Sequence, residues 1–140
     1  MTTIVRPALA AFVVGLAACG TNTPTGTNST STSQTPAAPT GGWLTLQLTT
    51  PRSNDGAVQF VVSGPTIDSA RVISYNGFAT STGSVANMVV TGQVASGTIG
   101  QIYVPDLSRT GEYQASVLAA AARDSYTLQD VSGYRAVLVR

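Results

Sequence analysis

The chain of 140 residues contains no histidine and only one cysteine. Without histidine it lacks the usual general base and the commonest metal ligand of proteins. A lone cysteine, Cys19, cannot form a disulfide within the chain and cannot supply a multi-cysteine zinc site. Serine and threonine are abundant, but there is no histidine or lysine to activate them. We therefore expect no catalytic residues, no metal and no cofactor.

Charge is equally scarce, since Asp, Glu, Lys and Arg make up 9% of the residues and lysine is absent. The seven basic residues are all arginines, and they are scattered among six acidic residues. Nucleic-acid binding needs a basic patch or stripe that offsets phosphate charge, and no such pattern occurs. We expect no nucleic-acid partner and no polybasic attraction to lipid headgroups.

Apolar runs are short, and the most prominent extends from Pro7 to Ala18 directly after Arg6. A helix needs about 20 apolar residues to cross a bilayer, and this run has about a dozen. A basic start, a short apolar stretch and small residues at the end are typical of a secretion signal. Residues 1–18 are therefore predicted to be a signal peptide. The alternatives are a plain secretion signal with an incidental cysteine, or an uncleaved membrane helix.

The residues Leu16-Ala17-Ala18-Cys19 at the end of this segment resemble the lipobox of bacterial lipoproteins, and the resemblance implies a cut between Ala18 and Cys19. The resemblance implies that Cys19 carries a diacylglyceryl group and that acyl chains anchor the exported protein to a membrane. Two or three chains are enough for stable attachment, because each buried CH₂ contributes about 0.8 kcal/mol. Gly20 follows the cysteine where an aspartate would imply retention at the inner membrane. The resemblance thus implies outer-membrane delivery in a host with two membranes.

Residues 19–42 are predicted to be the lipidated cysteine followed by a disordered tether. From Gly20 to Gly42 the sequence has no charge, no aromatic residue and no aliphatic residue larger than alanine. Such a segment cannot bury enough apolar surface to offset the entropy of ordering. Its many threonines and serines are consistent with an unmodified spacer or with an O-glycosylated stalk.

Residues 43–140 have a different composition, with short runs of alternating apolar and polar residues. We predict strands at Trp43–Thr49, Ala57–Val62, Ala70–Tyr75, Ala86–Val94, Gly100–Val104, Glu112–Leu118 and Tyr134–Val139. About seven short strands separated by turn residues in about a hundred residues indicate an all-β antiparallel sandwich, immunoglobulin-like or cohesin-like. Two segments are predicted to be irregular: a turn at Ser53–Gly56 and a single helical turn within Leu118–Ala122.

The first third of this module resembles the opening strands of cohesin-like domains. The resemblance is carried by the alternating aliphatics of Leu44–Leu48, the glycine-led strand Gly56–Val62 and the segment Asp68–Ser74. It implies a cohesin-like sandwich fold. It does not extend to the residues from Glu112 onward, so it implies nothing about dockerin-type partners.

Two kinds of functional residue are conceivable in the module. Loop aromatics can stack on sugars, and Phe78 with Tyr75 near the segment Asn76–Gly83 are the candidates; Trp43, Tyr113 and Tyr134 are expected in the core or at its rim. Paired carboxylates can hydrolyse glycosides, and the candidates are Asp106, Glu112, Asp124 and Asp130. Asn54-Asp55-Gly56 could contribute oxygens to a calcium site, although a turn is the simpler interpretation.

The sequence therefore predicts a lipid-anchored cell-envelope protein that presents a small β-sandwich for protein or surface binding, without catalysis. Its predicted partners are the membrane, through the acyl chains on Cys19, and an envelope protein or polysaccharide. A carbohydrate-binding module is the alternative, and a hydrolase is a more distant one.

Overall fold

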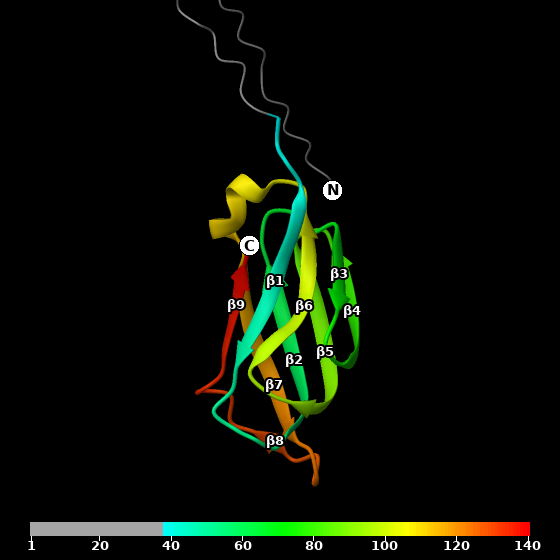
Figure 1. The fold of residues 1–140 in the computed structure, drawn as a ribbon, viewed down its shortest axis with the longest axis vertical. Helices are drawn as coiled ribbons and strands as arrows, with labels where there is room; N and C mark the ends of the chain where they lie inside the picture. Colours follow the sequence, from blue (N-terminus) through cyan, green and yellow to red (C-terminus); the bar gives the residue numbers. More distant parts are fainter. Residues whose placement is uncertain (1–37) are drawn as a thin grey trace, which may run out of the picture. The chain divides into compact units, whose positions relative to one another are not determined.

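The computed structural model describes residues 38–140, which form two antiparallel β-sheets packed face to face (Figure 1). Sheet A has the strand order β3-β6-β1-β9, and sheet B has the order β4-β5-β2-β7-β8. The elements are β1 (Gly42–Thr49), β2 (Asp55–Ser63), β3 (Ser69–Val72), β4 (Asn76–Thr82), β5 (Val85–Val94), β6 (Gly97–Val104), the 3-10 helix η1 (Leu107–Glu112), β7 (Gln114–Ala122), β8 (Leu128–Gln129) and β9 (Arg135–Val139). The predicted all-β sandwich is confirmed. The signal peptide, Cys19 and the tether as far as residue 37 lie outside the described residues.

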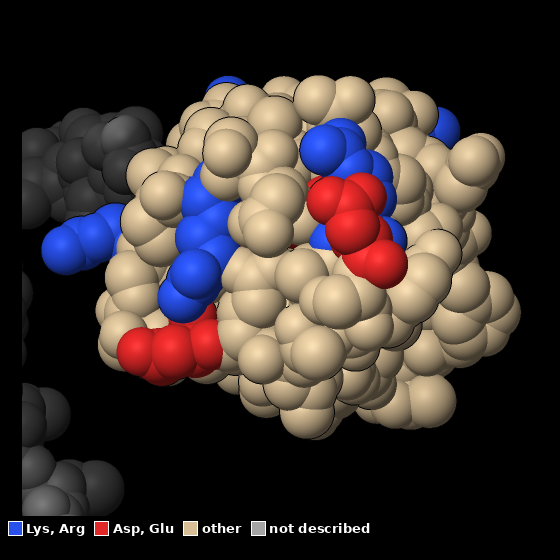
Figure 2. Space-filling model, turned by 90° about the horizontal axis from the view of Figure 1, so that it is seen from below, with Lys and Arg blue, Asp and Glu red and all other residues tan. Residues whose placement is uncertain are grey.

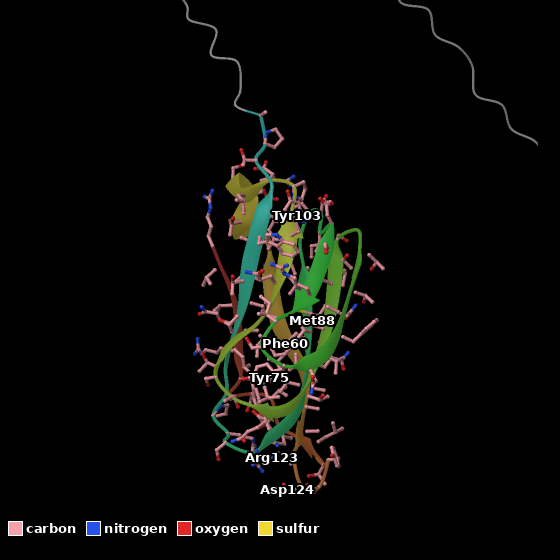
Figure 3. All side chains as sticks on the ribbon, turned by 45° about the vertical axis from the view of Figure 1, so that its right-hand side comes forward. Phe60, Tyr75, Met88, Tyr103, Arg123 and Asp124 are labelled. Carbon is pink, nitrogen blue, oxygen red and sulfur yellow. The ribbon has the colours of Figure 1, made fainter. Side chains whose placement is uncertain are left out.

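The core lies between the two sheets and follows the predicted alternation. Leu44, Leu46 and Leu48 of β1 face it from sheet A. Phe60 of β2 and Met88 of β5 are register partners in sheet B, and both side chains are fully buried (Figure 3). Burying each such side chain contributes about 1.5–3 kcal/mol relative to exposure. The apolar alternation of the sequence thus fixes the inner face of both sheets.

The segment after β3 differs from the prediction. A strand over Ala70–Tyr75 and a loop at Asn76–Gly83 were expected, but β3 ends at Val72 and residues 76–82 form β4. The chain leaves sheet A after β3 and enters sheet B at β4, which turns back into β5 through a tight turn with Gly83 at φ +63°. Glycine tolerates this angle without a steric penalty. The predicted loop was wrong because β5 supplies a hydrogen-bonding partner along the whole segment.

The alanine-rich end of β7 is also a correction. A helical turn was expected within Leu118–Ala122, but the strand continues through Ala122. Ala119, Ala120 and Ala121 pair with Gln59, Val58 and Ala57 of β2. Backbone pairing with a buried central strand overrides the modest helix propensity of alanine.

The only helical element among residues 38–140 is η1, which replaces the predicted start of a strand at Glu112. Asp106 caps it by accepting a hydrogen bond from the Ser108 amide at 2.9 Å. No helix in this part of the chain has the length and apolar character needed to cross a bilayer.

Candidate functional site

The outward face of sheet B carries no charged side chain, and we call it the neutral face. Its residues alternate with the core residues along the five strands and share their registers. They are Asn76, Phe78, Thr80, Thr82, Val85, Asn87, Val89, Thr91, Ala57, Gln59, Val61, Ser63, Gln114, Ser116, Leu118, Ala119, Ala121 and Leu128. Outward residues of an antiparallel sheet are usually polar, whereas about half of the residues on this face are apolar.

Large apolar side chains protrude from the neutral face, and small ones line a hollow between them. Phe78 is 67% exposed, Leu118 is 51% exposed and Leu128 is 81% exposed. Between the protruding residues runs a shallow hollow of about 190 Å³ lined by Ala57, Val58, Gln59, Val89, Ala119, Ala120, Ala121 and Leu128. The hollow exists because alanines occupy β2 and β7 where longer side chains would fill the space. We call this hollow the alanine trough.

A β-bulge at Leu118 turns Ala119 and Ala121, and not Ala120, toward the neutral face. In the pairing of β2 with β7, Gln59 faces Ala119 while Phe60 faces Val117, so Leu118 is an extra residue. Bulges reorient side chains and are frequent near sheet edges. This bulge was not predictable from the sequence, since Leu118 has the properties of an ordinary apolar strand residue.

The two aromatic residues predicted to contact a ligand have different environments. Phe78 is exposed, as expected, but it lies on strand β4 and not in a loop. Tyr75 packs partly against the core, and its hydroxyl bonds both the amide and the carbonyl of Ala95, at 3.2 and 3.3 Å. Tyr75 therefore holds the crossing between β3 and β4 against the turn that precedes β6. Of the pair, only Phe78 is highly exposed.

The outward face of sheet A contains a polar and aromatic cluster. The Arg71 guanidinium lies 4.0 Å from the centroid of the Trp43 ring, which in turn makes an edge contact with Tyr103 at 5.3 Å. Arg71 donates from Nε and Nη2 to Gln101 Oε1 at 3.1 and 2.6 Å. Gln101 also donates to Thr45 Oγ1 at 3.3 Å. These cross-strand contacts stabilise sheet A, with about 0.5–1 kcal/mol expected from an exposed cation–π pair.

Trp43 therefore does not seal the core. It pairs with Tyr103 on the outer side of sheet A, while its neighbour Leu44 faces inward. The alternation that predicted Leu44 as a core residue places Trp43 on the opposite face. In contrast, Tyr113 and Tyr134 are buried as expected, at 7% and 8% exposure.

The four carboxylates considered for hydrolysis have local structural roles. Hydrogen bonds from Ser108 lower the pKa of Asp106, and hydrogen bonds from Ser132 lower the pKa of Asp130. Glu112 accepts a bidentate pair of hydrogen bonds from Arg109, which lowers its pKa as well. A glycosidase acid needs a raised pKa, so these environments do not favour that role.

The fourth carboxylate, Asp124, has its Oδ1 atom 3.8 Å from Arg123 Nε. Figure 2 shows acidic and basic side chains next to one another at the lower end of the sandwich.

Asp55 is buried and is not a turn residue. It is the first residue of β2, has no exposed surface, and accepts hydrogen bonds from Thr50 Oγ1 and Tyr134 Oη, both at 2.6 Å. Burial and this hydrogen bond raise the pKa of Tyr134. Hydroxyl groups hydrogen-bond to both carboxylate oxygens, so Asp55 has a structural role and is not the simple turn residue expected in Asn54-Asp55-Gly56. Sequence reasoning missed this network because Asp after Asn is typical of an exposed turn.

A second hollow, of about 390 Å³, lies at one end of sheet B beside Tyr126. Its lining includes Arg123, Gln93 and Thr91, whose side chains carry hydrogen-bonding groups; Figure 3 marks Arg123 and Asp124 at this end. Tyr126 is 77% exposed and has φ +54°, an unusual angle for a bulky residue. A hydrogen bond from its amide to the Ala122 carbonyl at 2.9 Å holds the turn. The hollow thus combines an exposed aromatic ring with amide, hydroxyl and guanidinium groups.

No protein-family model matches the chain, and neither a curated protein nor a solved structure shows significant similarity to it. The arrangement of the described residues therefore carries the functional argument.

Proposed function

We propose that this protein is a lipid-anchored cell-envelope protein whose β-sandwich binds a protein partner through the neutral face. Export and lipidation at Cys19 are supported by the sequence around Ala18 and Cys19 alone. Binding is supported chiefly by one observation: the outward side chains of five strands include no charge, while Phe78, Leu118 and Leu128 protrude from them. Burying the apolar side chains of this uncharged face releases water from apolar surface without leaving any charge unpaired.

Photo-crosslinking in native envelopes tests the binding role. A crosslinking residue at Thr80, within the neutral face, should yield a specific adduct that Leu128→Lys abolishes. The same residue at Thr45, on the outward face of sheet A, is the positional control and should give no such adduct. Failure of the Thr80 probe to give any Leu128-dependent adduct would overturn the binding role.

Membrane fractionation tests the anchor separately. Cys19→Ser removes the sulfur that would carry the diacylglyceryl group, so the protein should leave the membrane fraction or accumulate unprocessed. Mass spectrometry of the wild-type protein should show an amino terminus at Cys19 with added acyl mass. An unmodified sulfur, or residues 1–18 still attached, would overturn the anchored location.

Saccharide binding is the second candidate function, and the hollow beside Tyr126 favours it. An exposed aromatic ring next to hydrogen-bonding side chains is the usual combination for holding a sugar ring. The candidate contacts are Tyr126, Arg123 and Gln93. This location differs from Phe78 and Tyr75, the loop aromatics that the sequence suggested.

Titration with envelope polysaccharides, followed by tyrosine fluorescence, tests this second candidate. Wild-type protein should respond, Tyr126→Phe should retain most of the affinity, and Tyr126→Ala should lose it. Equal responses from the wild type and Tyr126→Ala would exclude this hollow as the binding site.

A further inference from the structure

We infer that the partner of the neutral face is a second copy of this chain, packed face to face about a two-fold axis. The inference rests on the proposed function, because it identifies the partner of the same surface. Three properties of the face point to self-association: its relief, its charge and its area.

The relief of the neutral face is self-complementary. Phe78 of β4 and Val89 of β5 are register partners and form a ridge. The alanine trough lies beside this ridge, over β2 and β7. A two-fold rotation places the ridge of each copy over the trough of the other, so that large side chains meet small ones. Packing of two sheets through such interdigitated side chains is the usual geometry of a β-sandwich core.

The registers locate the two-fold axis. Val89, Gln59 and Ala119 are neighbours in one row across β5, β2 and β7. If Val89 of one copy lies over Ala119 of the other, the axis passes close to Gln59. The two Gln59 side chains then face each other, and each amide can donate to and accept from its counterpart. The polar residue on the axis is thereby satisfied.

The charge distribution favours a copy of the same chain over a charged partner. Two identical faces usually suffer like-charge repulsion wherever a charged residue lies near the axis. The neutral face has no charged residue, so this repulsion is absent at the axis, and Arg123 borders the face beside Ala57 and Thr91. A partner with charges at its contact surface would have to desolvate them with no opposite charge to meet.

The area of the face determines how tightly two copies bind. Strands β4, β5, β2 and β7 have seven to ten residues each and β8 has two. At about 3.3 Å per residue and about 4.8 Å between strands, they cover roughly 600 Å² per copy. The total of roughly 1,200 Å² lies at the lower limit for a specific interface, so the dimer in dilute solution should have micromolar or weaker affinity. Attachment of both copies to one membrane would raise their effective concentration and favour the dimer.

Sedimentation equilibrium of the full chain carrying Cys19→Ser tests the inference without lipid. A concentration series should show a reversible monomer–dimer equilibrium. Phe78→Lys and Leu128→Lys should each raise the dissociation constant at least about 100-fold, because a two-fold interface contains two copies of each unpaired charge. Val137→Lys is the matched control, since Val137 is 48% exposed on the outward face of β9 in sheet A, and it should leave the equilibrium unchanged. Circular dichroism checks that every variant keeps the β-sheet spectrum.

Crosslinking tests the position of the axis. In the same background, Gln59→Cys should be joined to a second Gln59→Cys by a short bismaleimide, whereas Gln47→Cys on the outward face of β1 should not. A chain that stays monomeric at all concentrations, or a dimer that neither lysine weakens, would overturn self-association through this face. If the chain is monomeric but the Leu128-dependent envelope adduct contains a different protein, the self-pairing is wrong and the proposed function stands. If both the dimer and the adduct are missing, both proposals fail.

Discussion

The outward faces of the two sheets differ in how their side chains are held. On sheet A, Arg71 contacts both Gln101 and Trp43 across neighbouring strands, and charged residues are present. On sheet B, protruding apolar side chains such as Phe78 and Leu128 lie next to alanines. On sheet A the polar and aromatic side chains satisfy one another through hydrogen bonds and ring contacts. Exposed apolar side chains, in contrast, would gain free energy if a partner covered them. The contacts on sheet A stabilise that sheet, and the exposed apolar residues of sheet B support the proposal that this face meets a partner.

The two sheets are expected to unfold together in one transition, and substitution of Asp55 tests this expectation with the largest effect. It links β2 of sheet B to Tyr134, which precedes β9 of sheet A. Asp55→Ala leaves the hydroxyls of Thr50 and Tyr134 buried without their acceptor, so we expect a loss of about 2–4 kcal/mol of unfolding free energy. Urea denaturation should show one transition, shifted to lower urea. Asp130→Ala, at an exposed aspartate, is the control and should shift the transition far less.

The stability of the protein at alkaline pH tests the same Asp55–Tyr134 contact through the tyrosine. Burial raises the pKa of Tyr134 above its ordinary value of 10.0, so the folded state keeps a proton that the unfolded state releases. The stability that Tyr134 contributes is therefore complete below about pH 10 and is lost as the pH rises through the folded-state pKa. Tyr134→Phe should cost about 1 kcal/mol at neutral pH and flatten this alkaline decline. Thermal unfolding between pH 8 and 11 measures it, with the exposed Tyr126→Phe expected to keep the wild-type slope.

Removing a contact of the polar and aromatic cluster on sheet A should lower the unfolding free energy and leave self-association unchanged. Arg71→Ala removes the cation over Trp43 and the two hydrogen bonds to Gln101, and we expect a loss of about 0.5–1 kcal/mol. Arg135→Ala, on the outward face of β9, is the comparison variant and should have a smaller effect. Urea denaturation gives the free energies, and sedimentation should show unchanged self-association. Weakened self-association in Arg71→Ala would contradict the proposal that only the neutral face of sheet B takes part in self-association.

Sheet B should show the opposite behaviour, with the smallest effect on stability. Phe78→Ser replaces an exposed side chain on the edge strand β4, so the unfolding free energy of the monomer should change by no more than about 0.5 kcal/mol. The same variant should weaken self-association, because the ridge beside the alanine trough is lost. A large loss of monomer stability would show that Phe78 packs within its own sheet and would contradict the comparison.

Much of the inner architecture was predictable because it depends on period-two alternation. Leu44, Leu46 and Leu48, together with Phe60, were expected inside and are buried. The alternation cannot say which outward residues face water and which face a partner, since Phe78 and Trp43 follow the same pattern. The bulge at Leu118 and the strand at Ala119–Ala121 depend on pairing with β2, which is distant in the sequence. Local propensity contains no information about that pairing.

The candidate site shows the same division. Phe78 was named from the sequence and is exposed, but the uncharged face around it is assembled from five strands that lie apart in the chain. Tyr75 was named with it and serves the fold instead, through its hydrogen bonds to Ala95. Tyr126 was not selected, because a turn aromatic shows no sign in the sequence of the hollow that will lie beside it.

The sequence by itself determined the inward faces of the strands and the scarcity of charge, since both are properties of neighbouring residues; lipidation at Cys19 stays a prediction. The tertiary structure alone decided that the uncharged residues gather on one sheet, that Asp55 is buried against Tyr134, and that Arg71 lies over Trp43. These features arise from pairings between segments far apart in the chain. Strand order and register, not local composition, decide which residues come together.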